Sequence, residues 1–196
     1  MSDDSTKPKR GCALTLVLVI LAILVVATGI VLSAMGYVRP FLMPTAEMVP
    51  AISNGDHVMM ETFTYRSSSR KPQRGDVVVF SSEKTGEALD PGIYILRIAG
   101  LPGDTLRLED GKLIVNDKPV NMTNIMGKIH YETLKESVFL NTTNEPVTVP
   151  EGSFFLLGDN STATKDSRFW GFLPAKQIMG KISFCFWPVN HIGIVK

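Results

Sequence analysis

The longest apolar run of the chain lies near its N-terminus. From Cys12 to Met35 the sequence carries no charged residue over 24 positions. At about 1.5 Å per residue, such a helix measures roughly 36 Å and can cross a hydrocarbon layer of about 30 Å. A cleavable signal peptide would have a shorter apolar region of about 7–15 residues and small residues at its end. Residues 33–35 match that ending poorly, so the pattern predicts a permanent transmembrane anchor over residues 12–36.

The charges before this run indicate its orientation. Lys7, Lys9 and Arg10 lie in the polar segment 1–11, and basic residues beside a membrane span are retained on the cytoplasmic side. We therefore expect a single-pass protein of the cell (plasma) membrane. Its N-terminus is predicted to be cytoplasmic, and residues 37–196 are predicted to form an extracytoplasmic domain.

After residue 36, short apolar runs alternate with Gly, Pro, Asn and Asp, which is typical of β-strands joined by turns. Asp110-Gly111 between two alternating runs is a strong hairpin signal, and Asn116-Asp117 marks a further turn. Helical periodicity is limited to a short stretch near Ala175–Met179. We predict strands at His57–Thr62, Asp76–Phe80, Gly92–Ala99, Thr105–Glu109, Lys112–Asn116, Ser153–Leu157 and Gly180–Phe186.

Composition narrows the function classes. The formal net charge is +1, and basic and acidic residues balance outside the N-terminal segment, which argues against a nucleic-acid partner. The chain has 2 cysteines and 3 histidines. Because Cys12 and Cys185 are predicted to lie on opposite sides of the membrane, no disulfide is expected. The histidines show no metal-ligand spacing, so we predict neither a metal nor a cofactor.

Three segments form a pattern. The first reads Pro-Thr-Ala-Glu-Met-Val-Pro over residues 44–50, and the second reads Leu-Arg-Ile-Ala-Gly-Leu-Pro-Gly-Asp over residues 96–104. The third has Gly-Asp-Asn at 158–160 and Asp-Ser-Arg at 166–168. In this order, behind an N-terminal anchor, they resemble the type I signal peptidases. These membrane-bound proteases release exported proteins with a serine nucleophile and a lysine base.

The resemblance implies a fold and a set of site residues. The fold is mainly β, with coiled antiparallel sheets and a smaller inserted β region at about 107–150. Met48 and Pro50 match residues that follow the nucleophile and are implied to contact substrate. The resemblance also implies that seven residues support the site, among them an Asp166–Arg168 ion pair and a hydroxyl at Thr164 that orients the lysine. They are Arg97, Gly103, Asp104, Asp159, Thr164, Asp166 and Arg168.

The sequence departs from the family at both members of the catalytic dyad. Aligning on Met48 and Pro50 places Glu47 at the nucleophilic serine and Thr45 at the preceding serine, whose hydroxyl helps bind the oxyanion. Leu96 stands at the lysine. A hydroxyl needs an adjacent base to attack a peptide bond, and leucine has no titratable group. We therefore expect a protease fold whose catalytic pair is not intact.

Three functions follow from this departure. The first is an inactive homologue that binds signal peptides, preproteins, an active signal peptidase paralogue or another membrane protein by strand addition. The second is an active signal peptidase with a rearranged site. The third is a structural subunit of a membrane complex. Apolar lining around Met48 and Leu96 would favour peptide binding, and a groove filled by side chains would favour the structural role.

Three further expectations concern side chains near the altered site. Thr45 faces no evident base, so it is not expected to act as a nucleophile. Lys165 would point away from Thr164 on an extended segment and is expected in solvent. A carboxylate in an apolar cleft is costly. We therefore expect Glu47 to be exposed or paired with a cation.

Overall fold

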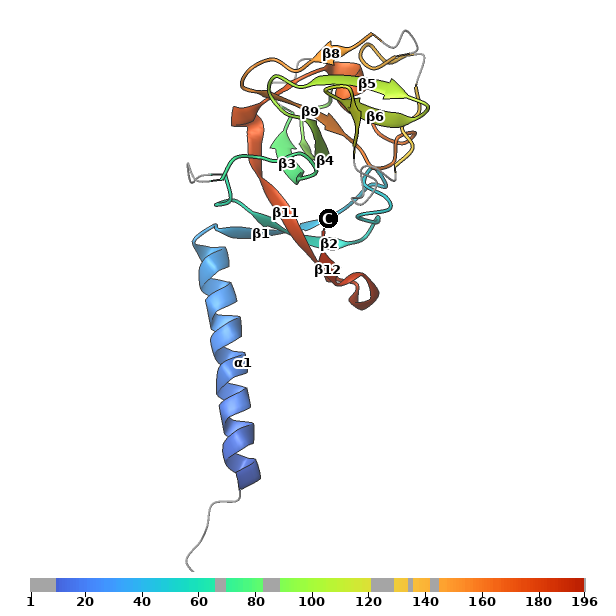
Figure 1. The fold of residues 1–196 in the computed structure, drawn as a ribbon. Coiled ribbons are helices and arrows are strands. Elements are labelled where there is room, and N and C mark those ends of the chain that lie inside the picture. Colours follow the sequence, from blue (N-terminus) through green and yellow to red (C-terminus); the bar gives the residue numbers. More distant parts are fainter. Residues whose placement is uncertain are drawn as a thin grey trace, which may run out of the picture. The chain divides into compact units, whose positions relative to one another are not determined.

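The computed structural model describes residues 10–65, 70–82, 89–120, 129–133, 136–141 and 145–195. The chain divides into two compact units, one ending at Val38 and the other comprising Arg39–Lys196 (Figure 1). The first unit consists mainly of the helix α1 (Arg10–Ala34). Among the described residues, Ala13–Ala34 is the helix long and apolar enough to cross a membrane, and none of it is buried within the structure. A helix that is apolar on all sides is typical of a membrane span.

The second unit is mainly β, as predicted. Its larger sheet has the order β1-β2-β11-β3-β4-β9-β10, with β12 paired to β11. The strands are β1 (Val38–Leu42), β2 (His57–Glu61), β3 (Val77–Ser81), β4 (Ile93–Gly100), β9 (Ser153–Leu157), β10 (Leu173–Pro174), β11 (Ile178–Trp187) and β12 (Gly193–Ile194).

A smaller antiparallel sheet has the order β7-β6-β5-β8. It consists of β5 (Thr105–Glu109), β6 (Lys112–Val115), β7 (Lys118–Pro119) and β8 (Val147–Thr148). In Figure 1 the strands β5 and β6 lie above β3 and β4 of the larger sheet. Much of the region between β7 and β8, within the predicted insertion, lies outside the described residues.

The hairpins of the smaller sheet form as predicted. Asp110 and Gly111 have φ angles of 48° and 72°, and Asn116 and Asp117 have 51° and 63°. Two consecutive positive φ angles define the two-residue turn that matches the twist of the flanking strands. Asn, Asp and Gly tolerate this backbone region better than other residues. The side-chain types at these four positions therefore determine where β5, β6 and β7 reverse direction.

Edge strands and short helices were missed by the sequence patterns. The strands β1, β7 and β10 each contain a proline and each lies at the edge of its sheet. Proline cannot donate to a neighbouring strand, so it is confined to such edges and weakens the strand pattern. The predicted helix near residues 175–179 is limited to a 3-10 turn, Ala175–Gln177, because β11 already begins at Ile178. A short helix α2 (Ser167–Trp170) was not predicted.

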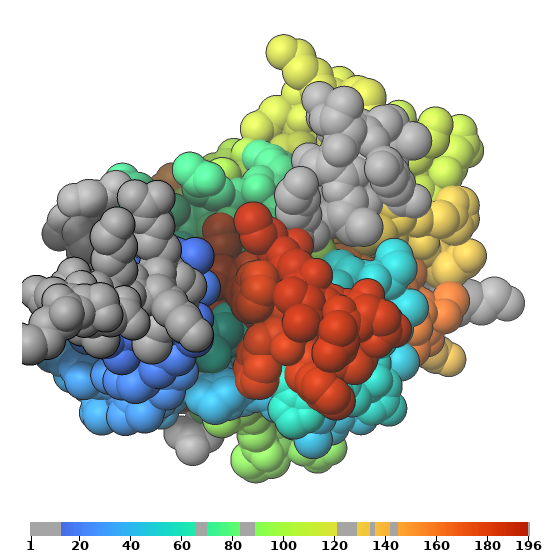
Figure 2. Space-filling model, turned by 90° about the horizontal axis from the view of Figure 1, so that it is seen from below, coloured from blue at the N-terminus to red at the C-terminus, as the bar shows by residue number. Residues whose placement is uncertain are grey.

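Alternation along β9 separates two hydrophobic cores. Phe154 and Leu156 pack into one core with β2, β3 and β11, while Phe155 and Leu157 pack into the other with the smaller sheet. Side chains alternate between the faces of a strand, so β9 is buried on both sides. The C-terminal segment, red in Figure 2, lies beside the region of β2, turquoise in the same view. This arrangement agrees with the pairing of β2 with β11.

Candidate functional site

The tertiary structure brings the three sequence segments together. The backbone N–H of Asn160 donates to the carbonyl oxygen of Glu47 at 2.9 Å. The side-chain amide of Asn160 donates to the carbonyl oxygen of Ala46 at 3.1 Å. The second and third segments meet through the pairing of Arg97 in β4 with Leu157 in β9. The loop after β9 therefore holds the loop that carries Glu47.

A buried ion pair joins β4 to this loop. Nε and Nη2 of Arg97 donate to the two carboxylate oxygens of Asp159 at 2.7 and 2.5 Å. Nη1 of the same guanidinium donates to the carbonyl oxygen of Gly75 at 2.7 Å. Both paired side chains are 0% exposed. Two parallel bonds fix the relative orientation of both groups, so Arg97 and Asp159 form a rigid support under the loop.

The predicted pairing of Asp166 with Arg168 is present and is also fully buried. Asp166 caps α2 by accepting the N–H of Arg168, and it also accepts the N–H of Gly158 at 3.1 Å. Burial raises the pKa of the Asp166 carboxyl, and the guanidinium of Arg168 opposes that rise. A pair in solvent contributes little, whereas this one is held inside a network.

The guanidinium of Arg168 also contacts two residues that the sequence patterns did not single out. It donates to the hydroxyl of Ser161 at 2.8 Å and to the carbonyl oxygens of Ser161 and Glu132 at 2.6 and 2.8 Å. The Ser161 hydroxyl in turn accepts the N–H of Glu132 at 2.7 Å. Arg168 thus ties the segment at Glu132 to the loop after β9. No local sequence signal marks these contacts because Glu132 and Arg168 lie 36 positions apart.

The turn after β4 is held by Asp104. Its carboxylate accepts the N–H of Leu101 at 2.6 Å and pairs with Arg74 at 2.8 Å, while Asn116 donates to it at 2.8 Å. Gly103 has a φ angle of 82°, a region that residues with a Cβ rarely adopt. Glycine and aspartate at these two positions therefore define the end of β4. Arg74 is a further supporting residue that the sequence patterns missed.

The structure differs from the expectation that Glu47 is either exposed or paired with a cation. Its side chain is half-buried rather than exposed. Its partner is the Thr45 hydroxyl, which donates to Oε2 at 3.1 Å. None of the Lys, Arg or His residues with described side chains forms an ion pair with it. Burial raises the pKa of the Glu47 carboxyl, Asp166 adds to the rise and the Thr45 hydroxyl opposes it. Thr45 accordingly does face a potential base, contrary to the sequence-based expectation.

The position predicted for the general base contains no titratable group. Leu96 is 1% exposed and packs in the first core together with Met48, which is 0% exposed. The Thr164 hydroxyl is buried and lies 2.7 Å from the carbonyl oxygen of Asn160 and 3.1 Å from that of Glu47. Lys165 is exposed, as expected. Substrate contact by Met48 stays a prediction, since its side chain has no accessible surface in this conformation.

Close packing places Thr164 against the backbone of the same loop. A Cβ added to Gly158 would lie 2.2 Å from Oγ1 of Thr164 and 2.5 Å from its Cγ2. Such distances are far inside van der Waals contact, so glycine is required at the first position of the Gly-Asp-Asn segment. The backbone of Gly158 and the Thr164 hydroxyl therefore fix each other's position next to Glu47.

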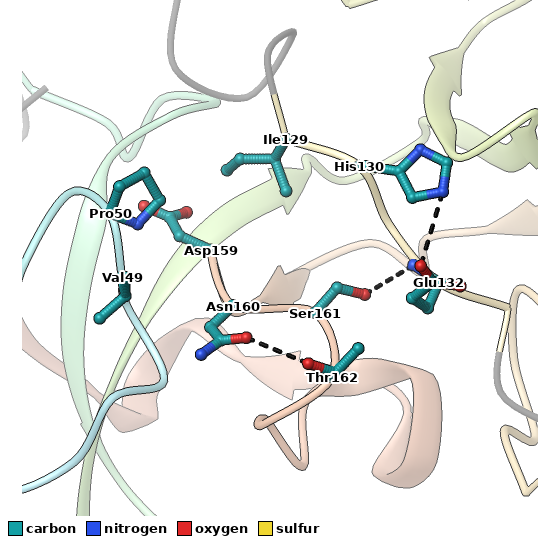
Figure 3. A pocket seen from close by; sticks show the side chains of 9 residues that line it. All are labelled: Val49, Pro50, Ile129, His130, Glu132, Asp159, Asn160, Ser161 and Thr162. Carbon is teal, nitrogen blue, oxygen red and sulfur yellow. Dashed lines mark hydrogen bonds and ion pairs between the residues drawn. The ribbon is translucent and has the colours of Figure 1, made fainter.

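An open pocket of about 370 Å³ adjoins this site (Figure 3). Its walls are Val49 and Pro50, the segment with Ile129, His130 and Glu132, and the loop 159–162. Pro50 is exposed, so this member of the predicted substrate-contacting pair does face open space. Among the described residues, no three His, Cys, Asp or Glu side chains are grouped as metal ligands.

The stability of the second unit is expected to depend on the charge of Glu47. The pKa of Glu47 in the folded protein lies above that of an exposed glutamate. The free energy that this group contributes to stability is therefore fully present below the pKa of the unfolded state, and it is lost as the pH rises through the pKa of the folded state. Glu47→Gln should remove this slope and raise the free energy of unfolding at pH 7 by about 0.5 kcal/mol, a small value because the charge keeps part of its hydration. Urea unfolding of the full-length protein in detergent measures it through Trp170 and Trp187. An unchanged slope in the variant would contradict the assignment to Glu47.

Comparison with known proteins identifies the family. Residues 13–187 match the family described as signal peptidase, peptidase S26. A signal peptidase I of Leptolyngbya laminosa is 31% identical over 153 residues, which cover 76% of this chain and 69% of that protein. A probable signal peptidase I-2 of Synechocystis is 33% identical over 153 residues, covering 78% of this chain and 64% of that protein. The chain therefore belongs to the signal peptidase family, peptidase S26, as the motifs predicted.

Two further similarities are of interest. Signal peptidase IB of Staphylococcus aureus is 30% identical over 161 residues, covering 79% of this chain and 80% of that protein. A crystal structure of a signal peptidase I from Enterococcus faecalis is 27% identical, with a TM-score of 0.44, covering 57% of this chain and 97% of that one.

Proposed function

We propose that this chain is a signal peptidase relative that binds signal peptides or preproteins without cleaving them. The proposal rests on the contrast between the buried ion pairs that support the site, which are intact, and the two predicted catalytic positions, which are altered. The buried Arg97–Asp159 and Asp166–Arg168 pairs are in place. At the centre, a leucine that is 1% exposed stands at the predicted base, and Glu47 stands at the predicted nucleophile.

Binding is proposed at the open space beside Glu47. Met48 and Leu96 do not line a groove, because both pack in the core. By the criterion stated from the sequence, this observation favours the structural role, so the case for binding rests on the open pocket. The accessible surface is instead the pocket at Val49 and Pro50, within a few residues of Glu47. An extended peptide in such a site gains main-chain hydrogen bonds and side-chain contacts. We also propose that α1 anchors the chain in the cell membrane with its N-terminus in the cytoplasm, on the strength of Lys7, Lys9 and Arg10.

The test combines binding and cleavage on the full-length protein in detergent. We expect a fluorescent signal peptide spanning its cleavage site to bind saturably, a scrambled peptide of the same composition to bind more weakly, and neither to be cut. Anisotropy measures binding and mass spectrometry measures cleavage. Cleavage by the natural protein would overturn the proposal. Absence of binding to signal peptides and whole preproteins would favour a structural subunit, or a partner such as an active paralogue or another membrane protein.

A second candidate is peptide cleavage by Thr45 with Glu47 as base. It rests on the 3.1 Å hydrogen bond between the two side chains and on the burial that raises the pKa of Glu47 and makes the carboxylate more basic. Oγ1 of Thr45 would bond to the peptide carbonyl carbon, its proton would pass to Glu47, and the departing amine would take that proton as the C–N bond breaks. Any observed cleavage should then disappear in Thr45→Val and persist in Thr45→Ser.

A further inference from the structure

The pocket adjoins the altered centre through Asn160, although Glu47 is not among the residues that line it. Asn160 lines the pocket, and its backbone N–H donates to the carbonyl oxygen of Glu47 at 2.9 Å. On the opposite wall, Val49 and Pro50 follow Glu47 by two and three positions. A peptide that passes Glu47 toward Pro50 therefore reaches this pocket within a few residues.

The walls differ in chemistry. Figure 3 shows Val49 and Pro50 on one side and the segment with Ile129, His130 and Glu132 on the other. Val49, Pro50 and Ile129 provide apolar surface, and Ile129 is 8% exposed. The volume of about 370 Å³ is within the usual range for small ligand sites. The pocket can thus accept a long side chain with an apolar stem.

Among the described residues, the charge at the pocket rim is negative and poorly compensated. The Glu132 side chain is 50% exposed, and its ion-pair partner among the described residues is His130, at 3.6 Å. That distance is too long for a hydrogen bond. Asp159, also at the pocket, is already paired with Arg97. Glu47 pairs with a hydroxyl and with none of the described cations. Glu132 is therefore the carboxylate that a ligand can reach.

The backbone around Glu132 is fixed, although its side chain is accessible. Its N–H donates to the Ser161 hydroxyl at 2.7 Å, and its carbonyl oxygen accepts from Arg168 at 2.8 Å. These contacts fix the backbone of Glu132 at the pocket rim, and they do not depend on the charge of its side chain. A substitution that changes only the side chain consequently leaves the framework of the pocket in place.

We propose that this pocket binds a lysine or arginine side chain of the peptide, beyond the residue that faces Glu47. The aliphatic stem lies against Val49 and Pro50, and the cationic head group pairs with Glu132. Long basic side chains combine these two properties. The assignment rests on the proposed function, because it names the peptide class that the same site selects.

The experiment measures affinity for a set of labelled peptides with the full-length protein in detergent at pH 7.5. Each peptide carries a signal-type sequence followed by four alanines, and each alanine in turn is replaced by lysine or by glutamate. We expect lysine at one of these positions to strengthen binding about fivefold and glutamate there to weaken it, as for a partly exposed ion pair. Glu132→Gln should remove the difference in affinity between lysine and alanine peptides.

Glu109→Gln is the matched control. Its side chain is 51% exposed and pairs with Arg107 on the smaller sheet, so the charge change and exposure are the same. It should retain the full preference for lysine. Equal affinity for all peptides in the natural protein, or a preference that survives Glu132→Gln, would overturn the assignment while the proposed function stands. Failure of every peptide to bind would overturn both.

Discussion

Replacing Glu47 by serine and Leu96 by lysine together is expected to turn the protein into a measurable peptidase. The serine hydroxyl would attack the peptide carbonyl carbon, and the lysine amine would take its proton and return it to the departing amine. Position 96 is 1% exposed in the natural protein. Burial lowers the pKa of a lysine amine toward neutrality, which keeps it unprotonated as a base.

The expected gain is large because loss of catalytic residues costs about 10⁴–10⁶-fold in rate. Recovering even part of it should raise cleavage of a signal peptide at least about 10³-fold above the natural protein. Cleavage of a fluorogenic signal peptide by full-length protein in detergent measures the rate. Mass spectrometry then checks that the cut falls after the signal sequence.

The single variants are the controls for this gain. Glu47→Ser has a hydroxyl but no base, and Leu96→Lys has an amine beside a carboxylate and no serine, so neither should cleave. Equal cleavage by the natural protein would show that Glu47 and Leu96 do not mark an inactive site. A folded double variant that binds peptide without cutting it would show that the buried supporting residues no longer position the serine and the lysine for catalysis.

The second large effect concerns the buried pair beneath the site. Arg97→Met is expected to lower the free energy of unfolding by about 3–5 kcal/mol, because it leaves the Asp159 carboxylate buried without its partner. Typical domains are stable by only about 5–15 kcal/mol, so the second unit would be close to unfolding. Urea unfolding of full-length protein, followed through Trp170 and Trp187, measures the change.

Two companion variants separate charge burial from lost packing. Arg97→Met combined with Asp159→Leu removes both charges and should recover much of the loss, since apolar pairs often replace buried ion pairs without cost. Arg107→Met removes a partly exposed arginine that pairs with Glu109 and Asp117 at the surface of the smaller sheet and should change stability little. A small effect of Arg97→Met alone would contradict the rigid support that we assign to this pair.

Local chemistry explains which parts of the fold the sequence predicts. The alternation in Thr105–Glu109 and the short apolar run in Ser153–Leu157 gave the strand bounds that the structure has. The Asp110-Gly111 turn followed from backbone preferences of just two residues. Edge strands such as β1 were missed because a proline interrupts their pattern. Their formation depends on a neighbouring strand from elsewhere in the chain.

The sequence predicted most of the residues that belong to the candidate site, but not the contacts that they make. The resemblance to signal peptidases implied that Arg97, Asp159, Asp166 and Arg168 support the site. It did not identify Arg74 or Ser161, which meet their partners through the fold. Arg97 and Asp159 lie 62 positions apart, and no local pattern determines such a pairing.

The sequence by itself determined the apolar helix, the central strands and hairpin turns of the second unit, and the motifs that place the chain among signal peptidases. Alignment with the family motifs also predicts that glutamate and leucine occupy the positions of the catalytic pair. Only the tertiary structure decided that Glu47 is half-buried against Thr45 and that a pocket with an accessible carboxylate at Glu132 lies beside it. Burial and charge pairing arise when distant segments pack together, and for that reason they could not be obtained from residue types and spacing.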